Sequence, residues 1–132
     1  HPAGTVILSR DAGIGKSAVL ASEMAVSQHF IAWRCGPRLN NLFLYFWLQH
    51  EKRHFESIAL GSTILTIGLP FFKRYKVVVP PRAEQDLAAA ILMNAEANLA
   101  SASMELDKLR NYKIGLMDDL LTGNVRVTGL IE

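Results

Sequence analysis

Cysteine and long apolar runs are the two features that this 132-residue sequence most clearly lacks. Cys35 is the only cysteine, which excludes an internal disulfide and a multi-cysteine metal site. The most apolar stretch, residues 42–48, is followed at once by the polar run QHEKR, so no membrane span is expected. No signal-like segment opens the chain, and we therefore expect a cytoplasmic protein. His1 in place of a start methionine suggests a fragment or an internal start.

Residues 1–82 contain few acidic residues, and residues 83–132 contain few basic ones. Residues 1–82 carry ten Lys and Arg against four Asp and Glu, a net of +6, and residues 83–132 carry four against eight, a net of −4. A basic head of this kind suits a polyanion such as DNA, whereas an acidic stalk does not. Ordinary variation of the surface is the alternative explanation.

The head has enough apolar residues for one small core, because 50% of the chain is hydrophobic. Its patterns of β-branched, aromatic and turn-forming residues predict both strands and helices. We expect strands at 4–9, 29–34 and 75–79, a strand or helix start at 17–20, a helix over 42–60 capped by Asn40 or Asn41 and broken at Gly61, and a short helical piece within 68–74. The pair Pro80-Pro81 closes the head, which we take as residues 1–82.

Beyond the two prolines, apolar residues recur in alternating steps of four and three, which predicts one long helix from about residue 83 to 121. At 1.5 Å per residue this helix is roughly 58 Å long, so we expect it to pair with another helix, in the same molecule or a second one. A surface helix folded back on the head is the weaker alternative. The seam consists of Ala88, Leu92, Ala95, Leu99, Ala102, Leu106, Leu109, Lys113, Leu116 and Leu120. Residues 83–122 are then a spacer or dimerisation helix, and 123–132 a tail or short strand.

The segment SRDAGIGKS, residues 9–17, resembles part of a phosphate-binding loop. Such a loop needs Gly-x-x-x-x-Gly-Lys-Ser/Thr, because its backbone N–H groups wrap the phosphates while the lysine reaches the terminal ones. Gly15, Lys16 and Ser17 are in register, but Arg10 stands at the first glycine position. No apolar strand ends in Asp for a magnesium ion, and the head leaves little room for several βα units. A truncated P-loop NTPase is therefore the less favoured alternative.

Two motifs resemble the C-terminal end of specificity subunits of type I restriction–modification systems. The family opens its long helix with Pro-Pro-Leu-x-Glu-Gln, and VVVPPRAEQDLAAAIL matches at Pro80, Pro81, Glu84 and Gln85, with Arg82 where leucine is usual. The family ends that helix with Lys-x-Gly-Leu-Met-x-x-Leu-Leu-Thr-Gly-x-x-Arg-Val. KLRNYKIGLMDDLLTGNVRV matches at Lys113, 115–117, 120–123, Arg126 and Val127. Upstream, ILSRDAGIGKSAVL, SQHFIAWR and ALGSTILTIGLPFF look like the second half of a target recognition domain of that family.

The resemblance implies an α+β fold, with part of a target-recognition-type α/β head and a long C-terminal coiled-coil helix. It implies a non-catalytic DNA-recognition subunit whose paired helices set the gap between two half-sites. Its partners would be DNA, methyltransferase subunits that bring S-adenosylmethionine, and a restriction motor subunit joined through the complex. The chain itself would hold no cofactor or metal. Because the family's domain starts well before Gly4, DNA binding by this head alone is doubtful, and a free-standing oligomer formed through the helix is the alternative.

Side chains able to contact DNA gather in the expected loops of the head. Phosphate contacts position a protein on DNA and base contacts specify the sequence; glutamine suits adenine and arginine suits guanine. The DNA-binding residues that we expect are Arg10, Lys16, Ser27, Gln28, His29, Ser62, Thr63, Lys73 and Arg74. For each of them a solvated loop or cap residue is the alternative. His50 and His54 have a spacing that could hold a metal, but no HExxH glutamate accompanies them, so we interpret them as surface residues.

Overall fold

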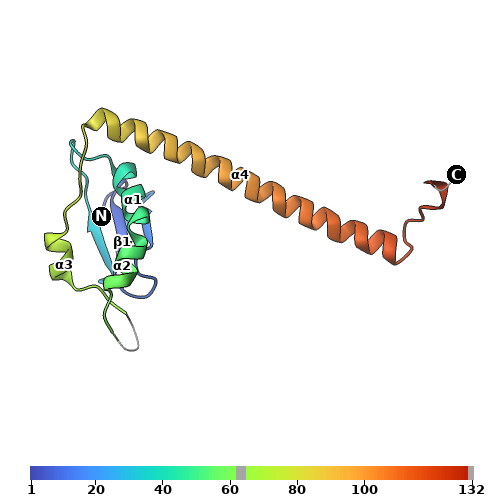
Figure 1. The fold of residues 1–132 in the computed structure, drawn as a ribbon, viewed down its shortest axis with the longest axis horizontal. Coiled ribbons are helices and arrows are strands. Elements are labelled where there is room, and N and C mark those ends of the chain that lie inside the picture. Colours follow the sequence, from blue (N-terminus) through green and yellow to red (C-terminus); the bar gives the residue numbers. More distant parts are fainter. Residues whose placement is uncertain (62–64, 131–132) are drawn as a thin grey trace. The chain divides into compact units, whose positions relative to one another are not determined.

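The computed structural model describes residues 1–61 and 65–130 of the chain (Figure 1). The chain divides into two units, His1–Leu92, here called the head unit, and Met93–Glu132, here called the tail unit. Each unit is treated by itself below. Among the described residues, no helix combines the length and the apolar character needed to cross a membrane.

The head unit is built on a three-stranded antiparallel sheet with the order β2-β1-β3. The strands are β1 (Val6–Ser9), β2 (Ser17–Val19) and β3 (Phe30–Trp33). Val6 pairs with Val19 on one side and with Trp33 on the other, so β1 is the central strand. Its Val6 and Leu8 side chains are fully buried. The strands predicted at 4–9 and 29–34 are therefore confirmed, and 17–20 contributes a strand.

Two short helices, α1 (Asn41–His50) and α2 (Lys52–Ile58), replace the single helix predicted over 42–60. The chain leaves helical geometry at Glu51, where φ is −77° and ψ is 1°. No proline or glycine marks this change, so the sequence pattern gave no sign of it. The predicted cap is confirmed for Asn40, whose Oδ1 accepts hydrogen bonds from the amides of Leu42 and Phe43.

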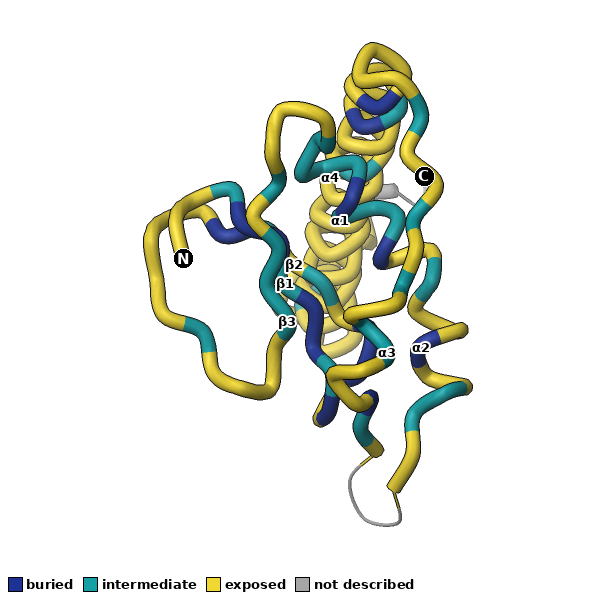
Figure 2. Tube along the Cα trace, turned by 90° about the vertical axis from the view of Figure 1, so that its left-hand side faces the viewer, coloured by how far each residue is buried: buried dark blue, intermediate teal, exposed yellow. Residues whose placement is uncertain are grey.

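The core lies between the sheet and these helices, since α1 packs on β1 and β2. Figure 2 shows buried segments on β1 and on the turns of α1 and α2. The buried apolar cluster consists of Val6, Leu8, Ile14, Leu44, Leu48, Phe55 and Ile67. It joins residues from the sheet, the β1–β2 loop, both helices and the segment before α3, so these segments are held in one packed body.

The short helical piece predicted within 68–74 is α3 (Leu69–Arg74), which follows Gly68 and has a proline in its first turn. Its Phe71 packs edge-on against Phe55, with ring centroids 6.3 Å apart. The prediction of a strand at 75–79 is wrong, because residues 75–80 form neither strand nor helix. Alternating apolar residues favour an extended chain, but a strand also needs a hydrogen-bonding neighbour. Within the described part of the chain, β2, β1 and β3 pair only with one another.

The long predicted helix is present as α4 (Arg82–Leu121), 40 residues in length. Just beyond its end, Gly123 has φ +77°, as expected for a glycine that terminates a helix. A 3₁₀ turn, Thr128–Leu130, follows within the described residues of the tail.

The first turns of α4 belong to the head unit and are attached there by Gln85. Its fully buried amide accepts a hydrogen bond from the Asn40 amide (2.8 Å) and donates to the carbonyls of Arg38 (3.0 Å) and Pro80 (2.8 Å). Asp86 accepts bonds from the side chains of Arg82 (2.8 Å) and Asn40 (2.6 Å). One asparagine thus caps α1 and contacts α4, which fixes the two helix starts side by side.

Candidate functional site

The loop between β1 and β2 holds most of SRDAGIGKS and is a tight antiparallel connection. The Ser9 amide donates to the Lys16 carbonyl (2.8 Å), the Gly15 amide to the Ser9 carbonyl (3.0 Å) and the Lys16 amide to the Gly13 carbonyl (3.2 Å). Gly13 and Gly15 have φ of +84° and +78°, a conformation that favours glycine. These amide N–H groups are therefore used inside the loop.

This geometry excludes a phosphate-binding loop. Such a loop runs from a strand into a helix whose first N–H groups face the phosphates, whereas here a second antiparallel strand, β2, follows. Gly15 has a packing role instead, since a Cβ atom there would lie 2.8 Å from Lys52 Cγ and 3.2 Å from Lys52 Cα. The Lys16 side chain folds back beside Gly13, where an added Cβ would be 3.3 Å from Lys16 Cδ. SRDAGIGKS is thus not the phosphate-binding loop of an NTPase.

Three segments meet at the end of the sheet where β1 finishes, and we call this region the loop end. They are the β1–β2 loop (residues 10–16), the turn before β3 (27–29) and the described residues on either side of 62–64 (Figure 1). Arg10 joins them, because its amide donates to the His29 carbonyl (3.0 Å) and its own carbonyl accepts from the Ile67 amide (2.8 Å) and the Thr66 hydroxyl (3.2 Å). The loop end is therefore a hydrogen-bonded platform.

A side-chain pair adds to the platform. The Asp11 carboxylate accepts a hydrogen bond from His29 Nδ1 at 2.5 Å, with 13% of the aspartate side chain and 57% of the histidine side chain exposed. The His29 amide donates to the Ser27 hydroxyl (3.4 Å), so that serine shapes the turn. Arg10 has a buried Nε without a hydrogen-bond partner in the described part of the chain. A buried donor with no partner is unusual in a folded protein.

The loop end brings together five of the residues expected to bind DNA: Arg10, Lys16, Ser27, Gln28 and His29. Ser62 and Thr63 lie outside the described residues. Lys73 and Arg74 occupy the last turn of α3, and Arg74 borders a different hollow, beside His54 and Tyr75. The structure therefore brings five of the predicted DNA-binding residues together at the loop end and places Lys73 and Arg74 elsewhere, on α3.

Sequence reasoning missed two residues beside this platform. Asp11 is the partner of His29, eighteen positions away, and Lys52 starts α2 directly against the loop glycine. Lys16 and Lys52 both line a hollow of about 600 Å³, together with Asp11 and Glu56. Lys52 also forms an exposed ion pair with Glu56 (3.4 Å), a contact of little energetic weight. No local sequence signal marks Lys52, because only the fold brings it to the loop.

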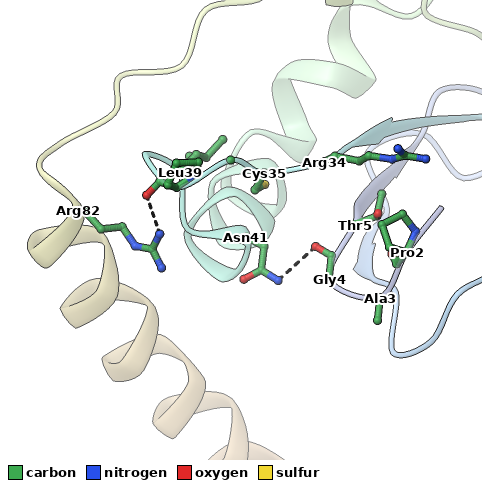
Figure 3. Close-up of a pocket in the computed structure, with 11 residues that line it drawn as sticks. Pro2, Ala3, Gly4, Thr5, Arg34, Cys35, Leu39, Asn41 and Arg82 are labelled. Carbon is green, nitrogen blue, oxygen red and sulfur yellow. Dashed lines mark hydrogen bonds between the residues drawn. The ribbon is translucent and has the colours of Figure 1, made fainter.

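A second pocket, about 450 Å³ in volume, lies between the N-terminal segment and the chain that leaves β3 (Figure 3). Two of its polar side chains are bonded to backbone: Asn41 Nδ2 donates to the Gly4 carbonyl (3.2 Å) and Arg82 Nη1 to the Pro37 carbonyl (2.9 Å). Cys35 also lines it, and partial burial raises the pKa of its thiol, which disfavours the reactive thiolate. These contacts hold neighbouring segments of the head together, so we interpret the pocket as structural and not as a binding site.

The tail unit, taken by itself, is mostly α4, and the predicted seam runs along it. Large apolar seam residues are exposed in the single chain: 72% for Leu99, 58% for Leu109 and 44% for Leu120. Apolar surface repeated at heptad spacing is typical of a helix that packs against another. The partner helix itself stays a prediction.

Comparisons with known proteins identify the family that the two motifs resemble. The sequence model of the type I restriction modification DNA specificity domain matches residues 1–111. The MjaVIII specificity subunit of Methanocaldococcus jannaschii is 24% identical over 112 residues, which is 85% of this chain and 25% of that protein. The MjaX specificity subunit of the same organism, a putative type I restriction enzyme subunit by its name, is 21% identical over 123 residues, 92% of this chain and 29% of that protein.

A solved structure shows the same fold. The type I restriction–modification S subunit from M. genitalium superposes with a TM-score of 0.65 at 21% identity, covering 88% of this chain and 33% of that one. The predicted α+β fold with a long C-terminal helix is thereby confirmed. This chain spans only about a quarter to a third of the length of these relatives.

Proposed function

Because this chain belongs to the type I restriction modification DNA specificity domain family, we propose that it recognises part of a DNA target for a type I restriction–modification enzyme. In this proposal the chain is not catalytic. Methyltransferase subunits carry the S-adenosylmethionine and the chemistry, and a restriction motor subunit joins through the same complex. The relatives named above are specificity subunits, which supports this assignment.

The observation that carries the proposal is the loop end. Loops held at one end of a rigid sheet are a common way to present binding side chains, because the scaffold has already ordered them. Here Arg10 is bonded through its backbone to both neighbouring segments, and His29 is fixed through backbone and side chain. Gln28, in the same turn, is exposed. The platform thus offers donors of several types over a small area.

The roles follow from the chemistry of each side chain. Lys16 is a flexible point charge, suited to a DNA phosphate. Arg10 has a fork of donors that suits guanine; because its Nε is buried, the terminal nitrogens of the guanidinium are the donors that we assign to the base. Gln28 suits adenine. The excess of positive charge in residues 1–82 attracts DNA over a longer range.

DNA binding measured against salt concentration tests these roles. Lys16→Ala should weaken binding to all sequences alike and reduce the slope of log affinity against log salt by about one. Arg10→Ala should also reduce the preference for one base pair. Lys73→Ala is the matched control, since this exposed lysine lies on α3. Equal losses from Lys73→Ala and Lys16→Ala would move the interface away from the loop end.

We also assign the seam of α4 to pairing with a second helix. The supporting observation is the exposure of its leucines at heptad spacing. A second copy of this chain or a corresponding helix of the same subunit would cover the same surface. In either arrangement the helix pair separates two recognition heads, and its length contributes to the gap between their DNA half-sites.

A further inference from the structure

We propose that Asp11 is a positioning residue that holds His29 so that its Nε2 atom contacts a base edge in DNA. This inference rests on the proposed DNA-recognition function. Beyond that function, it gives a role to the contact between Asp11 and His29, two side chains eighteen positions apart that the fold brings together.

Three hydrogen bonds hold His29, two through its backbone and one through its ring. Its carbonyl accepts a hydrogen bond from the Arg10 amide (3.0 Å), its amide donates to the Ser27 hydroxyl (3.4 Å), and its Nδ1 bonds to Asp11 Oδ2 (2.5 Å). Only 13% of the Asp11 side chain is exposed, so the packing around Asp11 limits its own movement. The imidazole ring therefore has little freedom to rotate.

The hydrogen bond to Asp11 also decides which ring nitrogen remains for a ligand. An ionised carboxylate only accepts, so Nδ1 carries the hydrogen and donates it. Nε2 is on the opposite side of the ring and has no partner within the described residues. The His29 side chain is 57% exposed, so the ring is accessible to a ligand.

Holding the ring in place lowers the entropy cost of binding. A free side chain loses rotational entropy when it contacts a ligand, and a side chain already held in place loses less. Histidine and aspartate pairs elsewhere in proteins orient the ring in this way for metal ions, by holding one nitrogen and presenting the other. Here the buried carboxylate is a scaffold and the exposed ring is the contact.

The charges favour a base over a phosphate as the ligand of Nε2. The Asp11 carboxylate offsets any positive charge on the ring beside it, which weakens attraction to a phosphate. A single hydrogen bond to a base edge does not need net charge. Arg10 and Lys16, in the same platform, are the residues that supply charge.

The test is selection of DNA sequences by the chain together with its methyltransferase subunits, followed by affinity measurements on single-base variants. We expect His29→Ala to relax discrimination at one base pair by about 3- to 10-fold, the size of one hydrogen bond. The salt slope should stay at the wild-type value. Asp11→Ala should relax the same base pair, and the double variant should be no worse than His29→Ala. Asp11→Asn should behave like wild type, because its carbonyl still accepts from Nδ1.

His50→Ala is the matched control, since His50 also lies beside a carboxylate, 3.9 Å from Glu51, but on α1. It should leave DNA recognition unchanged. Tryptophan fluorescence of each variant separates loss of folding from loss of contact, and Asp11→Asn together with His29→Ala keeps the test informative if Asp11→Ala unfolds.

Several results would overturn the inference. A uniform loss of affinity with a salt slope reduced by one would make His29 a phosphate contact. Normal recognition by folded Asp11→Ala beside impaired His29→Ala would remove the positioning role. If both are normal while Arg10→Ala and Lys16→Ala lose DNA, the inference fails and the proposed function stands. If the wild-type complex selects no sequence, the proposed function itself fails.

Discussion

Replacing Gln85 tests how the long helix is attached to the head. The side chain is fully buried, and its amide forms three hydrogen bonds, all to backbone groups of residues outside α4. Alanine at this position would leave the Asn40 amide and the Arg38 and Pro80 carbonyls without these partners. The attachment would then rest on the exposed hydrogen bonds of Asp86 and Arg82 and on the buried Ala89 of α4.

The expected loss follows from those three bonds. A buried polar group left without a partner costs about 1–3 kcal/mol. Residues 38, 40 and 80 are not fully buried, so water can reach them in part and the lower value applies to each. We therefore expect Gln85→Ala to lower the free energy of unfolding of the head unit by about 3 kcal/mol.

Urea denaturation followed by tryptophan fluorescence measures this loss, since both tryptophans, Trp33 and Trp47, lie in the head unit. Gln85→Glu is the informative companion, because an ionised carboxylate cannot donate to two carbonyls, and it should destabilise at least as much. Asp86→Ala, one position along and exposed, should cost far less. A loss below about 1 kcal/mol for Gln85→Ala would show that the three hydrogen bonds of Gln85 do not hold α4 to the head.

Three further predictions concern the loop, the helix start and the seam. Gly15→Ala should destabilise the head by more than about 1 kcal/mol in urea, because of its positive φ and its contact with α2, whereas Gly36→Ala, with open space around it, should change stability by less than about 0.5 kcal/mol. The pKa of Asp86 is lowered, first by the arginine at the helix start and then by the cap asparagine. Its contribution to stability is thus full above the ordinary aspartate pKa and is lost as the pH falls through the lowered value, so Asp86→Asn should flatten the acid side of the stability profile. Leu99→Asp should reduce helix pairing in analytical ultracentrifugation, while Ser101→Asp, off the seam, should not; equal behaviour of the two would contradict the seam.

The sequence predicted the elements that local signals specify. The strands at 4–9 and 29–34 and the helix over 83–121 have clear periodicity and clear ends, and the two motifs beside that helix correctly pointed to the family. The strand predicted at 75–79 failed because pairing depends on a distant neighbour. The break at Glu51 had no glycine or proline to mark it.

The candidate site was predictable only in part. Arg10, Lys16 and His29 stood out as donors in loops, but nothing in the sequence showed that one platform joins them. Asp11 was missed because its partner His29 is eighteen positions away. Lys16 belongs to the half of a phosphate-binding motif that this sequence matches. The loop is followed by a strand and not by a helix, which excludes that kind of loop, and this could be seen only in the structure.

If the loop end of this chain recognises DNA sequence, its side chains should decide which DNA the complex selects. The most direct measurement is selection from a random double-stranded DNA pool by the chain with its methyltransferase subunits, compared with the same complex carrying Arg10→Ala and Lys16→Ala. We expect one enriched sequence pattern for the wild type and its loss in the double variant, with folding retained. Enrichment of the same pattern by both complexes, or of none by the wild type, would contradict it.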